Sequence, residues 1–227
     1  MRRFFVTGTD TGVGKTFVTC AITRLLRARG QRVFAFKPIE TGCPLVSSLS
    51  PEGQGERLGE DQRALVEAAG GWQVGRLRGL YSLSQPLAPA VAARIDGVEI
   101  DLVAIRRLLE QGAAEADVAI VEGAGGWRVP ISDTLDMSAL AKLVVDQTAG
   151  VLVVARAGLG TINHSLLTIE AIERDGFEVA ALVLSTRPTD DPEMARSNAE
   201  ELCRRWTGPV VDVSRIETLD TFHVERR

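Results

Sequence analysis

Short apolar runs recur along the chain, separated by longer segments with helical periodicity. Five runs rich in Val, Ile, Leu, Phe and Ala lie at residues 4–6, 33–36, 118–121, 151–155 and 179–184, and a weaker one at 210–213. Near-continuous apolar runs of this length are typical of strands buried on both faces of a sheet. Their alternation with helical segments predicts parallel strands joined by right-handed crossovers. The sequence therefore predicts a doubly wound, mostly parallel α/β sheet in a three-layer fold.

Helices are expected between the strands, at residues 16–29, 61–69, 101–112 and 162–172. Leucines and an isoleucine of the third segment fall on one stripe, as a helix that covers a sheet requires. Residues 44–60 are rich in Ser, Pro and Gly and predict a long loop, which in a compact domain is often functional. Neither a repeat nor a linker interrupts the pattern, so residues 1–227 are expected to form a single domain.

A glycine-rich segment, TGTDTGVGKT, joins the first apolar run to the first helix at residues 7–16. Its glycines let successive backbone N–H groups point at one anion, while Lys15 adds a positive charge and Thr16 a hydroxyl at the helix start. The usual phosphate-loop motif, G-x-x-x-x-G-K-[ST], is one residue shorter, because Thr9 stands where its first glycine is expected. An ordinary strand-to-helix turn is the alternative. The order strand, loop, helix favours a P-loop NTPase-like fold that binds nucleotide phosphates.

Charged side chains follow two further predicted strands. Lys37 comes directly after residues 33–36, and Glu122 follows residues 118–121 and precedes a glycine-rich stretch. Since ligands of such folds bind at the carboxyl ends of strands, Lys37 is expected to stabilise phosphoryl charge and Glu122 to hold Mg²⁺. A solvated lysine and a core glutamate are the alternatives. Asp61 opens a helix, where an aspartate is commonly an N-cap, and a metal-binding role would require the preceding loop to fold back over the phosphates.

The segment GLGTINH, residues 158–164, leads from the fourth strand into a helix. Its glycines and the free N–H groups of the helix start suit an anion, although capping by Thr161 explains the same residues. His164 is interpreted as structural.

Composition narrows the class of partner. The formal charge of −4 and the pI near 5.4 give no support for binding to nucleic acid or to a membrane, so a small-molecule substrate is expected. Three widely spaced cysteines suit reduced thiols in a cytoplasmic protein, and two histidines disfavour a zinc site. Any metal should be bound through oxygen atoms. The apolar content of 45% is sufficient for a real core.

Four motifs in this order resemble the dethiobiotin synthetase family over roughly residues 3–185. They are TGTDTGVGKT, KPIETG (37–42), VEGAGGWRVPISD (121–133) and GLGTINH. The lengthened phosphate loop is itself the form found in that family. The resemblance implies a ligase of biotin biosynthesis that uses ATP and Mg²⁺ to carboxylate 7,8-diaminopelargonic acid with CO₂ and to close its ureido ring.

Roles follow from the resemblance, position by position. It implies that Lys15 and Lys37 are catalytic cations and that the metal is held by Thr16, Asp61 and Glu122. The implied ATP-binding residues are Gly12, Val13, Gly14, Lys15, Thr16, Phe17, Asp61, Glu122, Gly123, Ala124, Gly125 and Ser185. The implied substrate-binding residues are Thr41, Gly160, Thr161, Ile162 and Asn163.

The resemblance further implies a homodimer in which residues 160–163 of one protomer reach the active site of the other. Two positions depart from the family. Ser185 and Thr186 stand where an asparagine commonly reads adenine, and residues 211–214 replace a Gly-x-Ile-Pro stretch. We therefore expect weak selection among nucleobases.

Two other classes share the phosphate loop. A ParA/MinD-like switch ATPase carries a second lysine early in the loop, whereas Lys15 is the only lysine of residues 7–16. An amide ligase of the cobyrinate a,c-diamide synthase type normally carries a glutaminase domain, for which this chain is too short. Both remain alternatives to the synthetase.

Overall fold

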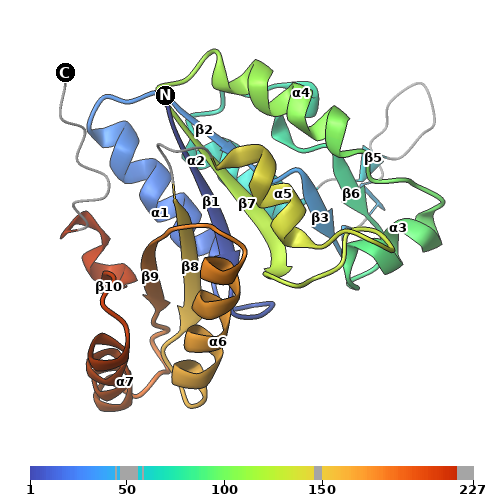
Figure 1. The fold of residues 1–227 in the computed structure, drawn as a ribbon. Helices are drawn as coiled ribbons and strands as arrows, with labels where there is room; N and C mark the ends of the chain where they lie inside the picture. Colours follow the sequence, from blue (N-terminus) through green and yellow to red (C-terminus); the bar gives the residue numbers. More distant parts are fainter. Residues whose placement is uncertain (44, 47–55, 58, 146–149, 219–227) are drawn as a thin grey trace.

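The main sheet contains the six predicted strands. The computed structural model describes residues 1–43, 45–46, 56–57, 59–145 and 150–218. The strand order is β10-β9-β8-β1-β7-β2, and each neighbouring pair is parallel (Figure 1). The strands are β1 Arg2–Gly8, β2 Val33–Phe36, β7 Val118–Gly126, β8 Val151–Arg156, β9 Val179–Ser185 and β10 Val210–Asp212. The predicted parallel α/β architecture is confirmed.

Helices cover both faces of this sheet, which gives the three layers (Figure 1). One face carries α1 (Lys15–Ala28) and α2 (Glu60–Ala68), together with the 3₁₀ segment η2 (Val213–Thr218). The other face carries α4 (Leu102–Ala113), α5 (Met137–Val144), α6 (Thr161–Arg174) and α7 (Pro192–Arg205). All four predicted helices form, with ends that differ by one or two residues from those predicted.

A smaller substructure lies beyond β2. It includes a parallel pair of three-residue strands, β3 (Ile39–Thr41) and β6 (Tyr81–Leu83), the 3₁₀ turn η1 (Gly75–Arg78) and the helix α3 (Pro89–Asp96). Within the predicted loop 44–60, β4 (Leu45–Val46) and β5 (Glu56–Arg57) pair in antiparallel fashion, and the rest of that loop up to residue 58 lies outside the described residues. The strands β3 and β6 are too short to give a periodic signal in the sequence.

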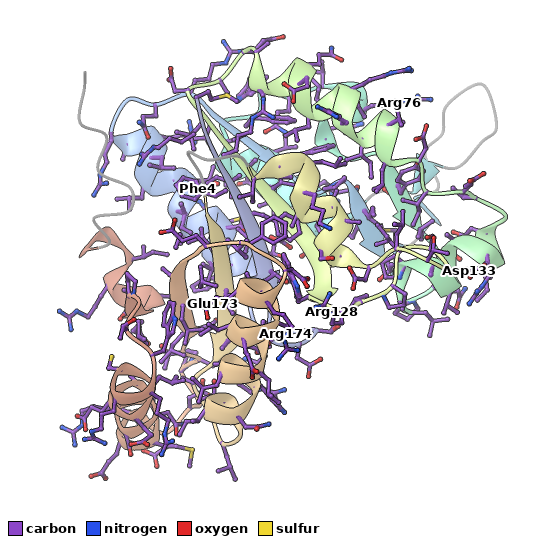
Figure 2. All side chains as sticks on the ribbon, in the orientation of Figure 1. Phe4, Arg76, Arg128, Asp133, Glu173 and Arg174 are labelled. Atoms are coloured by element: carbon purple, nitrogen blue, oxygen red, sulfur yellow. The ribbon has the colours of Figure 1, made fainter. Side chains whose placement is uncertain are left out.

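The core has two parts, one on each face of the sheet. Phe5, Phe34 and Phe36 are fully buried beneath α4 and α5, and Val6 and Ile22 belong to the layer between the sheet and α1. Ionisable side chains gather on the outside of the molecule, as Figure 2 shows for labelled residues on α6 and in the loop after β7. The buried charges near β2 and β7 are therefore exceptional.

Strand register brings the predicted charged residues together. Phe36 pairs with Val121 across β2 and β7, so the next residues of these parallel strands, Lys37 and Glu122, lie at the same edge of the sheet. On the other side of β7, Glu122 pairs with Val6 of β1, which leads into the phosphate loop. The fold thus delivers both residues to the position where the phosphate loop begins.

The cysteines are unpaired, with two buried and Cys203 exposed. Across the described ranges, no helix is both long enough and apolar enough to cross a membrane.

Candidate active site

The phosphate loop forms a turn that only glycine accommodates easily at two positions. Gly12 and Gly14 have φ angles of 71° and 98°, in the left-handed region. A Cβ at Gly14 would also lie 2.3 Å from Ser185 Oγ, so β9 and the loop are in close contact there. Lys15 begins α1 and folds back so that its Nζ donates to the carbonyl oxygen of Asp10 at 3.0 Å. This nest of N–H groups and an ammonium is suited to an anion.

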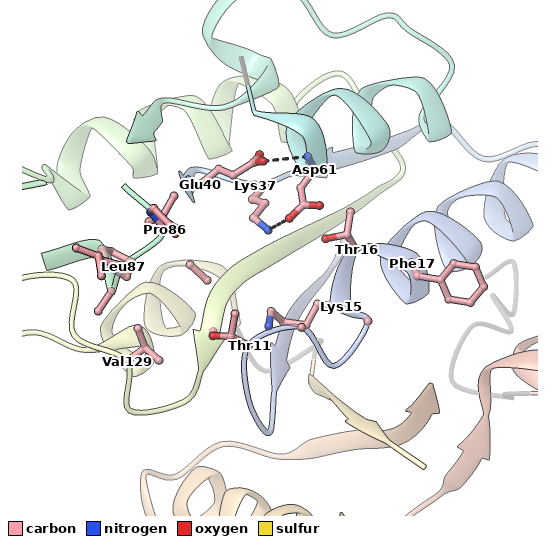
Figure 3. A pocket seen from close by; sticks show the side chains of 17 residues that line it. Thr11, Lys15, Thr16, Phe17, Lys37, Glu40, Asp61, Pro86, Leu87 and Val129 are labelled. Carbon is pink, nitrogen blue, oxygen red and sulfur yellow. Dashed lines mark hydrogen bonds and ion pairs between the residues drawn. The ribbon is translucent and has the colours of Figure 1, made fainter. Parts of the chain in front are cut away.

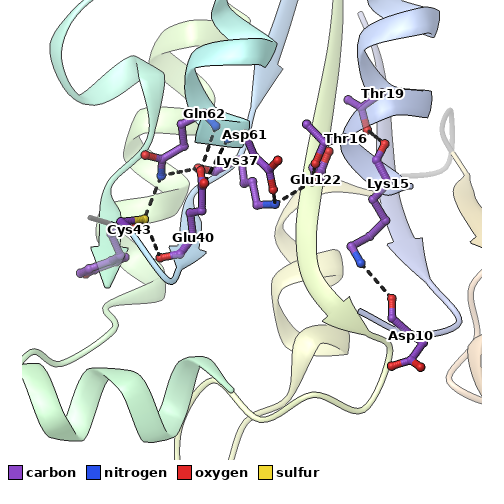
Figure 4. A network of polar contacts seen from close by, with 11 residues as sticks. Asp10, Lys15, Thr16, Thr19, Lys37, Glu40, Cys43, Asp61, Gln62 and Glu122 are labelled. Carbon is purple, nitrogen blue, oxygen red and sulfur yellow. Dashed lines mark hydrogen bonds and ion pairs between the residues drawn. The ribbon is translucent and has the colours of Figure 1, made fainter. Parts of the chain in front are cut away.

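Lys37 lies at the centre of a buried ionic network (Figure 4). Its Nζ donates to Glu122 Oε1 at 2.8 Å and to Asp61 Oδ2 at 2.5 Å. The hydroxyl of Thr16 donates to the same Glu122 oxygen at 2.8 Å. Four predicted site residues, from the end of β2 and from α2, β7 and α1, are therefore linked by direct contacts.

The structure also places Asp61 more precisely than the sequence did. The helix α2 begins at Glu60 with Gly59 at its N-cap position, so the interpretation of Asp61 as an N-cap residue is wrong. Asp61 lies in the first turn, and its carboxylate points toward Lys37. Asp61 thus forms an ion pair with Lys37, a contact between α2 and the end of β2 that the sequence alone could not establish.

Burial and charge change the basicity of both lysines. Burial, together with the nearby ammonium of Lys37, lowers the pKa of Lys15 to about 8, although the charge of Glu122 opposes the shift. Burial also lowers the pKa of Lys37, but the charges of Glu122 and Asp61 outweigh it, so the net shift is upward. Lys37 is therefore held as an ammonium, whereas Lys15 needs an anion beside it to hold its proton firmly.

The oxygen atoms around Lys37 suit a hard cation. Glu122 is fully buried, and within the described part of the chain its Oε2 has no hydrogen-bond partner. No group of three or more His, Cys, Asp and Glu side chains fit for a metal occurs among the described residues. Mg²⁺ is commonly held by one or two carboxylates together with substrate phosphates, and Thr16, Asp61 and Glu122 match that donor set.

These groups surround a cavity of about 690 Å³ (Figure 3), a size suited to a small ligand. Its lining includes ten of the predicted residues: Gly12, Gly14, Lys15, Thr16, Phe17, Lys37, Thr41, Asp61, Ala124 and Gly125. Val13 and Glu122 are buried behind this wall, and Gly123 packs near Phe5 and Met137. The P-loop and strand-end predictions thus converge on one cavity.

Sequence reasoning missed part of the lining. Glu40, Thr11, Val129 and the segment 86–89 also line the cavity. Glu40 is nearly as buried as Lys37, with 7% of its surface exposed. In the sequence, the feature that points to a site role for Glu40 is its position three residues after Lys37 on the same short segment.

A second cavity of about 850 Å³ adjoins the first at Phe17, whose side chain is shared by the two linings. Thr186, Arg187 and Asp212 line it, on the edge of the sheet formed by β9 and β10. Ser185 lines neither cavity, because its side chain packs beneath Gly14. Its suggested contact with a nucleobase remains a prediction.

The segment 160–163 forms the start of α6, with Gly160 at the N-cap in the left-handed conformation. Thr161 is buried, and its hydroxyl lies 3.5 Å from Ser165 Oγ. Asn163 is exposed, and none of the four residues is part of either described cavity lining. Within one chain, this predicted substrate segment is therefore separate from Lys37.

Comparison with known proteins agrees with this geometry. An AAA domain family model matches residues 2–221. The ATP-dependent dethiobiotin synthetase BioD of Anaeromyxobacter dehalogenans (strain 2CP-C) is 43% identical over 207 residues, which cover 90% of this chain and 85% of that protein. The enzyme of the same name from Aromatoleum aromaticum is 40% identical over 215 residues, covering 93% and 89% of the two chains.

Solved structures share the fold at low sequence identity. MinD in the MinC:MinD cell division complex of Aquifex aeolicus superposes with a TM-score of 0.51 at 16% identity, covering 93% of this chain and 81% of that one. A ParA family ATPase from Chlorobium tepidum gives a TM-score of 0.52 at 12% identity, with coverages of 93% and 84%. Similarity at this level concerns the fold alone and gives the switch ATPase no further support.

Proposed function

Because this chain belongs to the family of ATP-dependent dethiobiotin synthetases, we propose that the cavity around Lys37 is where it closes the ureido ring of dethiobiotin. The chain is an ATP-dependent ligase of biotin biosynthesis, acting on 7,8-diaminopelargonate, CO₂ and ATP. The observation that carries the assignment to this cavity is the contact of Lys37 with Asp61 and Glu122 beside the phosphate loop.

The chemistry brings anions together. One amine of the diamine takes up CO₂ as a carbamate, and a carbamate oxygen attacks the γ-phosphorus of ATP while ADP leaves. The second amine then attacks the carbonyl carbon of the mixed anhydride, closing the ring and expelling phosphate. No protein nucleophile is required, since positioning and charge stabilisation dominate phosphoryl transfer.

The two lysines supply the positive charge. Lys15, at the start of α1, would contact the β- and γ-phosphates, and Lys37, directly after β2, faces the same cavity. Each would offset charge that develops on the transferring group. Thr41, half-buried in the lining, offers a hydroxyl to the diamine or its carbamate.

Thr16, Asp61 and Glu122 would hold Mg²⁺ once the nucleotide contributes its phosphates. The ion would supply further charge neutralisation to the triphosphate. The free Oε2 of buried Glu122 supports this assignment.

The remaining nucleotide contacts are proposed from the residues that line the two cavities. Residues 12–17 and 123–125 would enclose the phosphates, with Val13 and Gly123 shaping the wall from behind. The base would enter the second cavity past Phe17, near Ser185. Both cavities together are large enough for a nucleotide and a small acid.

We further propose a homodimer in which Gly160, Thr161, Ile162 and Asn163 of one protomer bind the substrate carboxylate at the other protomer's site. The support is their separation from Lys37 within one chain, together with a helix N-terminus at which the described residues provide no side-chain cap. The unpaired cysteines support a cytoplasmic location.

A reconstitution assay tests the function. Purified protein is mixed with 7,8-diaminopelargonate, bicarbonate, Mg²⁺ and ATP, and dethiobiotin is measured by mass spectrometry against stoichiometric phosphate release. We expect product only when all components are present. Lys37→Ala, with ATP binding checked separately, should abolish the product. Formation of phosphate without dethiobiotin would reject the assignment.

A further inference from the structure

We propose that Glu40 is a positioning residue: it fixes the first turn of α2 and thereby holds the Asp61 carboxylate beside Lys37. This inference rests on the proposed function. Glu40 lies in β3, between the strand-end lysine and the predicted substrate residue Thr41. Its side chain lies deep in the wall of the first cavity, where it was not expected from sequence (Figure 3).

The carboxylate of Glu40 caps α2 from outside the helix. Its Oε1 accepts from the backbone N–H of Asp61 at 3.0 Å, and its Oε2 accepts from the N–H of Gln62 at 2.8 Å (Figure 4). The residue at the N-cap position, Gly59, has no side chain to do this. A carboxylate at this end of a helix also interacts favourably with its dipole. Glu40 thus replaces the ordinary N-cap from another strand.

The glycine at the N-cap position makes room for this contact. Gly59 has a φ angle of −72°, which any residue can adopt. A Cβ on Gly59 would lie 2.1 Å from Glu40 Oε2 and 2.6 Å from Gln62 Oε1. The requirement for glycine is therefore steric, and it comes from the capping carboxylate and its neighbour.

The side chain of Gln62 makes further hydrogen bonds between α2 and the segment 37–40. Gln62 donates from Nε2 to the carbonyl oxygen of Lys37 at 3.1 Å, and its Oε1 accepts from Ser82 Oγ at 2.8 Å. The segment Lys37–Glu40 and the first turn of α2 are therefore bound to each other twice through backbone groups. The Lys37–Asp61 ion pair is a third contact between them, made by side chains.

The Glu40 cap matters because the Asp61 side chain is partly open to solvent. The Asp61 side chain is 40% exposed, whereas Lys37 is 7% exposed. Without Glu40, two N–H groups lose their acceptors and the first turn of α2 loosens, so the Asp61 carboxylate leaves its place beside Lys37. Misplacement of this kind, through a residue that supports a ligand, typically costs about 10–100-fold in activity.

The test compares Glu40→Ala and Glu40→Gln with the parent. Gln keeps the volume but accepts only one of the two N–H groups, because its NH₂ group faces the other. We expect kcat for dethiobiotin to fall about 10–100-fold in both variants, with the ATP dissociation constant within about threefold of the parent. Asp101→Asn changes the cap of α4, a distant helix, and serves as the matched control with unchanged kcat.

Two further measurements separate positioning from general loss of stability. In the free protein, the amides of Asp61 and Gln62 should exchange with solvent at least about tenfold faster in Glu40→Ala, while those of α4 stay unchanged. In a double-mutant cycle, Glu40→Ala should cost little in a background that already carries Asp61→Asn, because its effect passes through Asp61.

A kcat within threefold of the parent, unchanged exchange at Asp61, or an equal loss in the Asp61→Asn background would each overturn the proposal. A parent protein that forms no dethiobiotin would instead reject the proposed function. The exchange measurement on the free protein would still decide whether Glu40 holds the turn.

Discussion

Replacing Lys37 with Met is predicted to destabilise the free protein as well as to stop turnover. The substitution removes the ammonium that lies 2.8 Å from Glu122 Oε1 and 2.5 Å from Asp61 Oδ2. Glu122 is fully buried, and among the described residues it would keep only the Thr16 hydroxyl as a donor. A methionine fills the space of the lysine stem without supplying a charge, so the loss of stability measures the contribution of the ionic contacts.

The expected size follows from the burial of Glu122. Removing one partner of a buried ion pair typically costs about 3–5 kcal/mol, because the other charge is left uncompensated. For a domain of this size, each kcal/mol shifts the melting temperature by about 2–4 °C. We therefore expect Lys37→Met to lower the melting temperature by about 6–20 °C. The partly exposed Asp61 contributes little to this figure.

Thermal and urea unfolding in the presence of a chelator measure the effect without ligand. Lys142→Met, on the exposed side of α5, is the matched control and should stay within about 2 °C of the parent. The double variant Lys37→Met with Glu122→Gln should recover most of the lost stability but no activity, because it removes the stranded charge. A normal melting temperature for Lys37→Met, or a double variant no more stable than the single one, would refute the reasoning.

Three further predictions concern ligands. Because burial lowers the pKa of Lys15 to about 8 and a bound triphosphate raises it, ATP binding above this pH should take up a proton. Affinity should then fall up to about tenfold per pH unit, and calorimetry in buffers of different ionisation enthalpy should show no uptake for Lys15→Met. Since Ser185 packs beneath the phosphate loop, we expect measurable dethiobiotin synthesis with CTP and GTP, and turnover with ATP alone would locate base selection elsewhere. Asn163→Asp should raise the KM for the diamine while sparing ATP binding, and mixing it with Lys37→Ala should restore activity through heterodimers with one intact site. Continued inactivity after verified subunit exchange would exclude a shared site.

The residues that the sequence located best are those fixed by the parallel sheet. Lys37 and Glu122 each follow an apolar run, and parallel register alone brings such positions to one edge. The phosphate loop is likewise local, since its glycines, lysine and threonine are consecutive. These parts of the site depend on periodicity and order, which a single sequence contains.

The parts that sequence reasoning missed depend on contacts between distant segments. Glu40 lies in a strand of three residues and caps a helix that begins twenty residues later, so no local pattern shows its role. Asp61 was expected at a helix start, yet its exact place in the first turn depends on that cap. The lining at residues 86–89 follows β6, which is too short to predict. Tertiary contacts, rather than propensity, set these positions.

The position of Lys37 between two carboxylates also has a thermodynamic consequence for metal binding. A free Mg²⁺ ion would have to displace an ammonium that already neutralises Asp61 and Glu122, so the competition weakens its affinity for the empty protein. A metal that arrives together with a triphosphate meets no such obstacle, because the phosphates offer the displaced ammonium a new partner. The ammonium of Lys37 therefore favours binding of Mg²⁺ together with the nucleotide over binding of Mg²⁺ alone. Because Lys37 already neutralises these carboxylates, the stability of the ligand-free protein does not depend on the magnesium concentration.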